Sequence, residues 1–124
     1  MKTIISTAKA PAAIGPYSQA TDLGSLVITS GQLPIDPATG AFPEGIQEQT
    51  KQSLTNVKAI LEAAGLTMDS VVKTTVFLSD MNNFGAMNEV YGEFFSEPYP
   101  SRAAFEVAAL PKAAKVEIKA VAYL

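Results

Sequence analysis

With 124 residues, the chain is long enough to bury a hydrophobic core as one domain, and it contains no cysteine, which excludes disulfides and thiolate chemistry. Nine basic and twelve acidic residues give a net charge of −3 without a basic cluster, which argues against nucleic acid as the main partner. The absence of histidine excludes serine–histidine and cysteine–histidine nucleophiles, and it leaves a zinc ion only oxygen ligands.

Charged residues make up only 17% of the chain, against a usual share of about 25%, and hydrophobic residues make up 48%. Such a small number of charged residues is too few to cover the surface of a small monomer. We therefore interpret the low share of charged residues as a sign of a buried subunit interface. No apolar run is long enough for a signal peptide or a membrane span, and the lack of cysteine is compatible with a reducing compartment. We therefore expect a cytoplasmic protein without a membrane partner.

Three short strands are predicted in the first third of the chain. A β-rich run covers 2–6, and two further runs, 17–22 and 25–31, are joined tightly at Leu23 and Gly24, which is typical of a hairpin. Both faces of the third strand carry apolar residues, so neither face is expected to be fully solvated. Prolines and glycines between 34 and 45 then form a loop before a helix.

The predicted helix begins at Ile46, because apolar residues recur at helical spacing as far as Ala64 and Gly65 then provides a C-terminal stop. A β-branched strand over 71–79 follows. On it, four residues are expected to share one face: Val72, Thr74, Val76 and Leu78.

A second helix is predicted after Asp80 or Asn82, either of which can cap it. Its aromatic stripe is most simply part of the core rather than a ligand box. The stripe comprises Phe84, Met87, Tyr91 and Phe94 or Phe95. Two prolines end the helix and lead into the strand that carries Arg102.

The last strand covers 115–123, and its apolar even positions fit a face covered by helices. Alternation in the two final strands then predicts that Arg102 and Glu117 share the opposite face. The complete order is β, β, β, α, β, α, β, β, which favours a single α+β domain over 1–124 with both helices on one side of the sheet. The face without helices still needs a cover.

Arg102 is the only arginine of the chain. Its guanidinium offers donors in a plane that matches a carboxylate or phosphate bidentately, whereas the eight lysines offer mobile point charges. A small anion is therefore the first candidate ligand. The alternative is a solvated surface charge, which is the commoner role of an isolated arginine.

Other candidate groups leave alternatives open. Glu117 is either an exposed strand carboxylate or a partly buried acid or base whose pKa is raised. Tyr17 and Ser30 could donate hydrogen bonds to a ligand, although hydroxyls in strands are more often structural. The glycines have neither the spacing of a dinucleotide fingerprint nor that of a P-loop, so nothing indicates a nucleotide.

Several motifs together resemble the RidA family, also called YjgF, and the resemblance extends over nearly the whole chain. The motifs are Ile14-Gly15-Pro16-Tyr17-Ser18-Gln19, Thr29-Ser30-Gly31-Gln32, Arg102 with Glu106 and Val107, Leu110-Pro111-Lys112 and Val116-Glu117-Ile118. The resemblance implies a chorismate-mutase-like α+β subunit with a mixed sheet and two helices on one face. It also implies a homotrimer whose sheets form a central barrel, with a cleft between each pair of subunits.

The activity implied by the resemblance is deamination of 2-iminobutanoate and 2-iminopropanoate. These enamine or imine products of pyridoxal-phosphate dehydratases are hydrolysed to 2-oxo acids and ammonium, and neither a cofactor nor a metal is implied. Arg102 would clamp the substrate carboxylate and Glu117 would position or activate water. Further substrate-binding positions implied by the resemblance are Tyr17, Ser30, Gly31, Asn88 and the backbone of Ala104.

Two positions depart from the family pattern. Ala104 stands where many relatives have cysteine, so no thiol can be essential here. Lys119 replaces an acidic residue that is common in relatives, which changes the local field near Glu117.

Two other classes of function stay open from the sequence. One is a non-catalytic module that binds 2-oxo acids or amino acids, and the other is a holdase-like interaction protein that uses exposed apolar surface. Ribonuclease activity, which is ascribed to some relatives, is disfavoured by the acidic balance and the lack of histidine.

Overall fold

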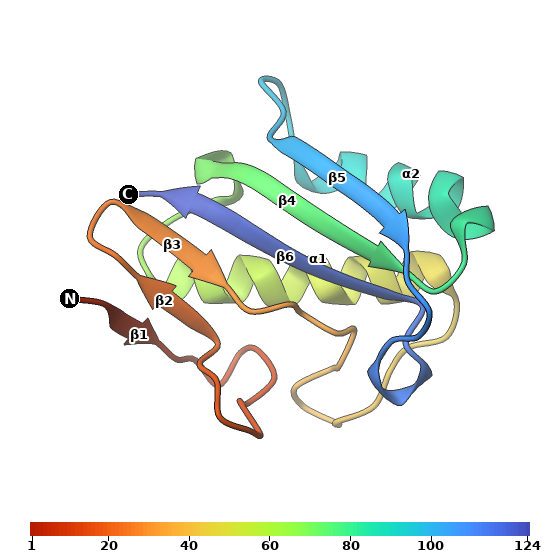
Figure 1. Cartoon of the computed structure of the whole chain (residues 1–124), viewed down its shortest axis with the longest axis horizontal. Helices are drawn as coiled ribbons and strands as arrows, with labels where there is room; N and C mark the ends of the chain where they lie inside the picture. Colours follow the sequence, from red (N-terminus) through yellow and green to blue (C-terminus); the bar gives the residue numbers. More distant parts are fainter.

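One six-stranded mixed sheet with two helices on one face makes up the computed structural model, which describes residues 1–124 (Figure 1). The strands are β1 (Thr3–Ile5), β2 (Ala20–Asp22), β3 (Leu26–Thr29), β4 (Val71–Leu78), β5 (Ser101–Glu106) and β6 (Val116–Tyr123). The helices are α1 (Ile46–Ala63) and α2 (Phe84–Phe94), and short 3-10 turns cover Met68–Ser70, Met81–Asn83 and Pro111–Ala113. This confirms the predicted α+β class and order of elements.

The strand order is β1-β2-β3-β6-β4-β5, so β6, the last strand in sequence, lies in the middle of the sheet. All neighbours are antiparallel except β4 and β5, which are parallel. A parallel pair requires a crossover connection, and α2 provides it. β1 and β5 form the two edges.

The predicted hairpin of β2 and β3 is present, but both strands are shorter than expected. Gly24 adopts a φ of +91° in the turn, where the Leu23 amide donates to the Leu26 carbonyl at 2.8 Å. A second tight turn precedes β2, in which the Tyr17 amide donates to the Gly15 carbonyl at 2.8 Å. This turn explains why the strand begins at Ala20 rather than at Tyr17.

A β-bulge in β4 places one residue on the opposite face of the sheet from the one predicted. The register against β6 shifts between Val71 and Lys73, so that Val71 is buried while 41% of Val72 is exposed. The prediction that Val72 shares the face of Thr74, Val76 and Leu78 is therefore wrong. An extra residue in one strand reverses the alternation on its far side, which a uniform period of two does not anticipate.

The core lies between the sheet and the two helices. In Figure 1 both helices lie behind the strands. α1 packs against β6 and β3, and α2 packs against α1. The even positions of β6 are all buried, as predicted: Val116, Ile118, Ala120 and Ala122. Below them, α1 contributes a buried stripe that includes Leu54, Val57 and Leu61.

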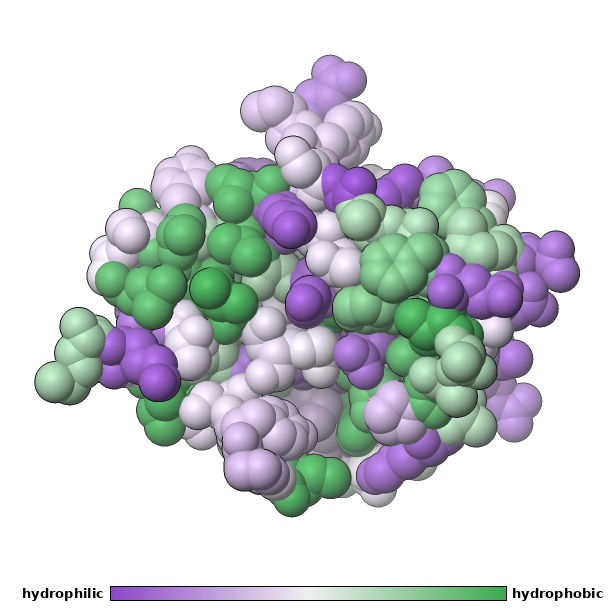
Figure 2. Space-filling view, in the orientation of Figure 1, coloured by the Kyte–Doolittle hydropathy of each residue, from purple (hydrophilic) through white to green (hydrophobic).

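The other face of the sheet carries no helix and exposes several large apolar side chains. They include Ile4 (64% exposed), Ile28, Phe105 and Tyr123 (53% exposed). Figure 2 views this face and shows apolar groups in two areas, with charged groups between them. No helix of the chain is both long and apolar enough to cross a membrane.

Candidate active site

The edge strand β5 places Arg102 on the helix side of the sheet. In the parallel register, Arg102 pairs with Thr74 of β4, and Thr74 is buried toward the helices. Paired residues on neighbouring strands project to the same face, so Arg102 reaches toward α2. Ala104, two residues further along, is half-buried against the core on this same face.

Three residues of α2 hold the guanidinium of Arg102. Its Nη1 donates to the Oδ1 of Asn88 at 2.7 Å. Its central carbon lies 4.7 Å from the ring centroid of Tyr91 and 5.4 Å from that of Phe84, which are cation–π distances. All three partners are neutral, so the positive charge of Arg102 is fixed in place without being neutralised.

Tyr91 is itself tied to the sheet. Its hydroxyl and that of Thr74 lie 2.7 Å apart and share a hydrogen bond. Burial raises the pKa of Tyr91, while the Thr74 hydrogen bond and the Arg102 charge lower it by less. The phenol therefore stays neutral, and its ring forms a rigid support beneath the guanidinium.

A cavity of about 450 Å³ opens beside this charged group. It is lined by Asn88, Tyr91, Gly92, Tyr99, Pro100 and Arg102. Arg102 is the only charged residue of the lining, so the cavity favours an anion of the size of a small carboxylic acid.

Glu117 lies on the helix-free face of the sheet. It pairs with Phe77 of β4, and desolvation raises the pKa of its carboxyl, with Lys119 lowering it by less. A Cβ atom added to Gly31 would clash with the Glu117 carboxylate, so only glycine leaves room for it there. The Lys119 ammonium lies 5.8 Å from the Phe77 ring on the same face.

Arg102 and Glu117 do not share a face, which corrects the sequence-based prediction. Phe105 packs edge-to-face on Phe77 with ring centroids 5.2 Å apart, which fixes the odd positions of β5 on the face of Glu117. Arg102, at an even position, is on the other side. From strand spacing and rise, their Cα atoms are roughly 14 Å apart.

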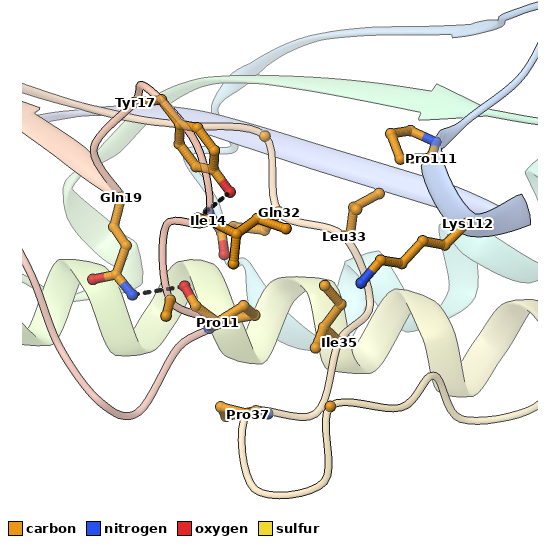
Figure 3. Close-up of a pocket in the computed structure, with 13 residues that line it drawn as sticks. Pro11, Ile14, Tyr17, Gln19, Gln32, Leu33, Ile35, Pro37, Pro111 and Lys112 are labelled. Atoms are coloured by element: carbon orange, nitrogen blue, oxygen red, sulfur yellow. Dashed lines mark hydrogen bonds between the residues drawn. The ribbon is translucent and has the colours of Figure 1, made fainter.

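Ser30 and Tyr17 lie near the end of β3. The Ser30 hydroxyl donates to the Ser18 carbonyl at 2.6 Å, which is a structural hydrogen bond. The Tyr17 oxygen accepts a long hydrogen bond from the Ile14 amide, 3.4 Å, and half of the side chain is exposed. Tyr17 and Gly31 line a second cavity of about 430 Å³, separate from the one beside Arg102 (Figure 3).

The predicted residues thus form two groups on one subunit. Arg102 and Asn88 are in contact beside α2, with Ala104 on the same strand. Gly31 and Glu117 are in contact on the opposite face, near Ser30 and Tyr17.

Comparison with known proteins of similar sequence and structure identifies the family to which this chain belongs. A family model described as Endoribonuclease L-PSP matches residues 7–124. A 2-iminobutanoate/2-iminopropanoate deaminase of Salmonella typhimurium is 56% identical over 125 residues, which cover 98% of each chain. The chain belongs to the RidA/YjgF family.

Two solved structures of the family extend this match to the fold. The crystal structure of Escherichia coli TdcF with bound serine has a TM-score of 0.95 and 52% identity, covering 98% of both chains. RidA from an Antarctic Psychrobacter has a TM-score of 0.95 and 50% identity, covering 98% of this chain and 99% of that one. The family resemblance inferred from the sequence is confirmed.

The sequence interpretation missed the aromatic residues around Arg102. The stripe on α2 was predicted to be core, and Met87, Tyr91 and Phe95 are indeed buried. Phe84 and Tyr91 nevertheless also contact the guanidinium. An aromatic stripe has the same helical spacing in either role, so only the parallel register of β5 reveals the second one.

Proposed function

We propose that this chain is a 2-iminobutanoate/2-iminopropanoate deaminase, which hydrolyses 2-imino acids released by pyridoxal-phosphate dehydratases to 2-oxo acids and ammonium. The observation that supports this most directly is the un-neutralised guanidinium of Arg102 at a cavity of about 450 Å³. Family members with about half of their residues identical to this chain carry that activity in their names. The E. coli TdcF structure with bound serine adds that a relative holds a small α-carboxylate.

The chemistry requires little from the protein. A protonated imine is already electrophilic, so orienting it beside a positioned water molecule can supply much of the acceleration. Arg102 holds the carboxylate, and water adds to the iminium carbon to give a carbinolamine. A proton then moves to nitrogen, the carbon–nitrogen bond breaks, and ammonium leaves the 2-oxo acid.

Glu117 is the group best suited to position the attacking water molecule and to accept a proton from it. Desolvation raises the pKa of its carboxyl, so it is a better proton acceptor than an ordinary exposed glutamate. Gly31 lies against it. In this proposal Ser30 and Tyr17 are further substrate-binding residues, and the backbone of Ala104 faces the imine. With alanine at that position, the main chain and water carry any role there.

The assembly in this proposal is a homotrimer with a central barrel. Arg102 and Glu117 lie on opposite faces of one subunit, so a site that uses both is best completed by a neighbouring copy. The exposed apolar side chains of the helix-free face and the low share of charged residues support such burial. A cytoplasmic location, where dehydratases release their products, belongs to the same proposal.

A second candidate is a binding module for amino acids or 2-oxo acids, which the serine-bound relative favours. Turnover separates the two, because a binding module holds 2-oxobutanoate without accelerating ammonium release. The endoribonuclease named by the family model gains no support here, since the chain has no histidine and a net charge of −3.

The decisive experiment times the decay of imine generated by a dehydratase in the presence of each variant. Arg102→Ala is expected to lose about 3 kcal/mol of transition-state stabilisation, roughly a hundredfold in kcat/KM. Arg102→Lys should recover only part of this, because the bidentate geometry is lost. Decay in Arg102→Ala as fast as in the wild type would refute the clamp.

A further inference from the structure

The cavity beside Arg102 is larger than a carboxylate clamp alone requires. Its volume of about 450 Å³ is within the range of sites that enclose a whole small molecule. The substrates of the proposed reaction carry only a methyl or an ethyl side chain. A substrate held by Arg102 therefore leaves part of the cavity free for a larger side chain.

The six residues that line the cavity fall into two groups. Asn88 and Tyr91 contact the guanidinium of Arg102, and these three residues form the clamp. The other three, which carry no charge, are Gly92, Tyr99 and Pro100. A substrate whose carboxylate is held by the clamp meets this second group with the rest of its structure.

The order of residues along β5 separates the imine from the substrate side chain. Tyr99 and Pro100 directly precede β5, and Arg102 is the second residue of the strand. Ala104, whose backbone faces the imine in the proposed reaction, lies two residues further on. The substrate side chain is therefore expected on the other side of the clamp, toward Tyr99 and Pro100.

Tyr99 provides an aromatic surface at this end of the cavity. It lies near the end of the connection from α2 to β5, which projects beyond the sheet in Figure 1, and 60% of the residue is exposed. An exposed aromatic ring next to a proline ring releases water when an apolar group covers it. This end of the cavity consequently favours an apolar side chain.

Gly92 forms the part of the wall that α2 contributes here. It lies one helical turn after Asn88, so both residues are on the same side of the helix. A Cβ atom added to Gly92 would meet no atom within 4 Å, and its φ is not in the left-handed region that favours glycine. The space that a side chain would fill at this position is therefore open, and it belongs to the cavity that Gly92 lines.

We propose that Gly92 determines how large a side chain the Arg102 site accepts, a role that rests on the deaminase function proposed above. The missing side chain leaves room, beside Tyr99 and Pro100, for an apolar substrate side chain larger than ethyl. A larger residue at position 92 would fill this space from the side of α2. Gly92 is thus a specificity-determining residue rather than a part of the clamp.

The test compares two substrates that differ in the size of the side chain. An L-amino-acid oxidase generates 2-iminopropanoate from alanine and 4-methyl-2-iminopentanoate from leucine, and the decay of each imine gives kcat/KM. Gly92→Leu should lower the ratio of kcat/KM for the larger over the smaller substrate about tenfold to a hundredfold, because it occupies the space that the isobutyl group needs. Gly92→Ala should lower this ratio by less.

Gly85→Leu is the matched control. Gly85 is also on α2, and a Cβ atom added there meets no atom within 4 Å, but Gly85 does not line the Arg102 cavity. The ratio for Gly85→Leu should therefore equal that of the wild type. Thermal unfolding controls for a general loss of structure, which would lower both rates together and leave their ratio unchanged.

Binding of the product 2-oxo acids tests the same role without turnover. In calorimetric titrations, Gly92→Leu should weaken the binding of 4-methyl-2-oxopentanoate about tenfold or more relative to that of pyruvate. Both acids should bind much more weakly to Arg102→Ala, because the clamp holds their carboxylates in this cavity.

Four results would overturn this role of Gly92: an unchanged ratio in Gly92→Leu, an equal change in Gly85→Leu, no binding of either 2-oxo acid to the wild type, or undiminished binding to Arg102→Ala. A size effect on 2-oxo acid binding without any imine turnover would instead refute only the deaminase function. The two failures are therefore distinguishable.

Discussion

Arg102 is exposed, yet it differs from an ordinary surface charge because three side chains of α2 fix it. A free arginine samples many rotamers, and ordering it on a ligand costs entropy. Here the Asn88 hydrogen bond and the two aromatic rings order it before a ligand arrives. In the carboxylate clamp that we propose, this arrangement makes Tyr91 a positioning residue for Arg102.

Replacing Tyr91 tests this role. Tyr91→Leu removes the ring, and we expect kcat/KM for imine hydrolysis to fall about tenfold, as for the loss of a partly buried cation–π contact. Tyr91→Phe keeps the ring and loses only the Thr74 hydrogen bond, so its activity should stay within about twofold to threefold of the wild type. Circular dichroism of both variants controls for folding. Equal losses in the two variants would contradict a role for the ring.

Because the pKa of Glu117 is raised, we expect the stability of the folded chain to depend on pH. Its pKa is raised above the ordinary value of 4.5, so the folded chain binds more protons than the unfolded chain between 4.5 and the raised value. Stability contributed by this group is therefore complete at low pH and is lost as the pH rises through that interval.

The comparison variant is Glu117→Gln, which keeps the shape and cannot ionise. As the pH rises through this window, the Tm of the wild type should fall relative to that of Glu117→Gln, and the difference should be constant below it. Thermal unfolding of both proteins across a pH series measures this. If instead the Tm of the wild type rose relative to that of Glu117→Gln with increasing pH, the attraction between Glu117 and Lys119 would outweigh the desolvation of Glu117.

At the end of β3, Gly31 gives Glu117 its space. Gly31→Ala would place a methyl group where the carboxylate lies, so Glu117 must rotate away. Because the side chain can move, the expected loss of stability is only about 1 kcal/mol. Imine hydrolysis should fall more, by about tenfold to a hundredfold, because the group proposed to position water is misplaced.

The matched control is Gly85→Ala on α2, where an added Cβ meets no atom within 4 Å. Alanine in an exposed helical position should raise stability by about 0.5–1 kcal/mol and leave the activity unchanged. Thermal unfolding and imine-decay rates of the two variants provide the comparison. If Gly31→Ala retained full activity, the position of Glu117 would be irrelevant to catalysis.

The same strands show what the sequence could and could not predict. β6 is central and buried on one side, so its alternation of Val116, Ile118 and Ala120 predicted its face correctly. β5 is an edge strand with all but one residue exposed, so its pattern carries little information about its faces. The face of Arg102 became clear only from pairing with β4.

The candidate site shows the same limit. The single arginine and the family motifs predict Arg102, Glu117 and Gly31 as members of the candidate site. Lys112 belongs to the Leu110-Pro111-Lys112 motif, but its left-handed backbone conformation is not predicted from the sequence, because residues other than glycine and asparagine rarely adopt it.

For the whole molecule, the arrangement of the two groups of site residues implies a test of assembly. In a symmetric trimer whose sites each take Arg102 from one subunit and Glu117 from its neighbour, two inactive variants can complement each other. A subunit carrying Arg102→Ala still provides Glu117, and a subunit carrying Glu117→Gln still provides Arg102. A correct pairing of the two restores one intact site.

We therefore expect activity to return when Arg102→Ala and Glu117→Gln subunits are unfolded together, mixed in equal amounts and refolded. Random mixing in a cyclic trimer gives each site one chance in four of two intact groups, so about a quarter of wild-type activity should be recovered. Each variant refolded alone is the control and should stay at its own low rate. Sedimentation measures whether the mixture is trimeric. A trimeric mixture without recovered activity would mean that both groups act from one subunit, despite lying on opposite faces of its sheet.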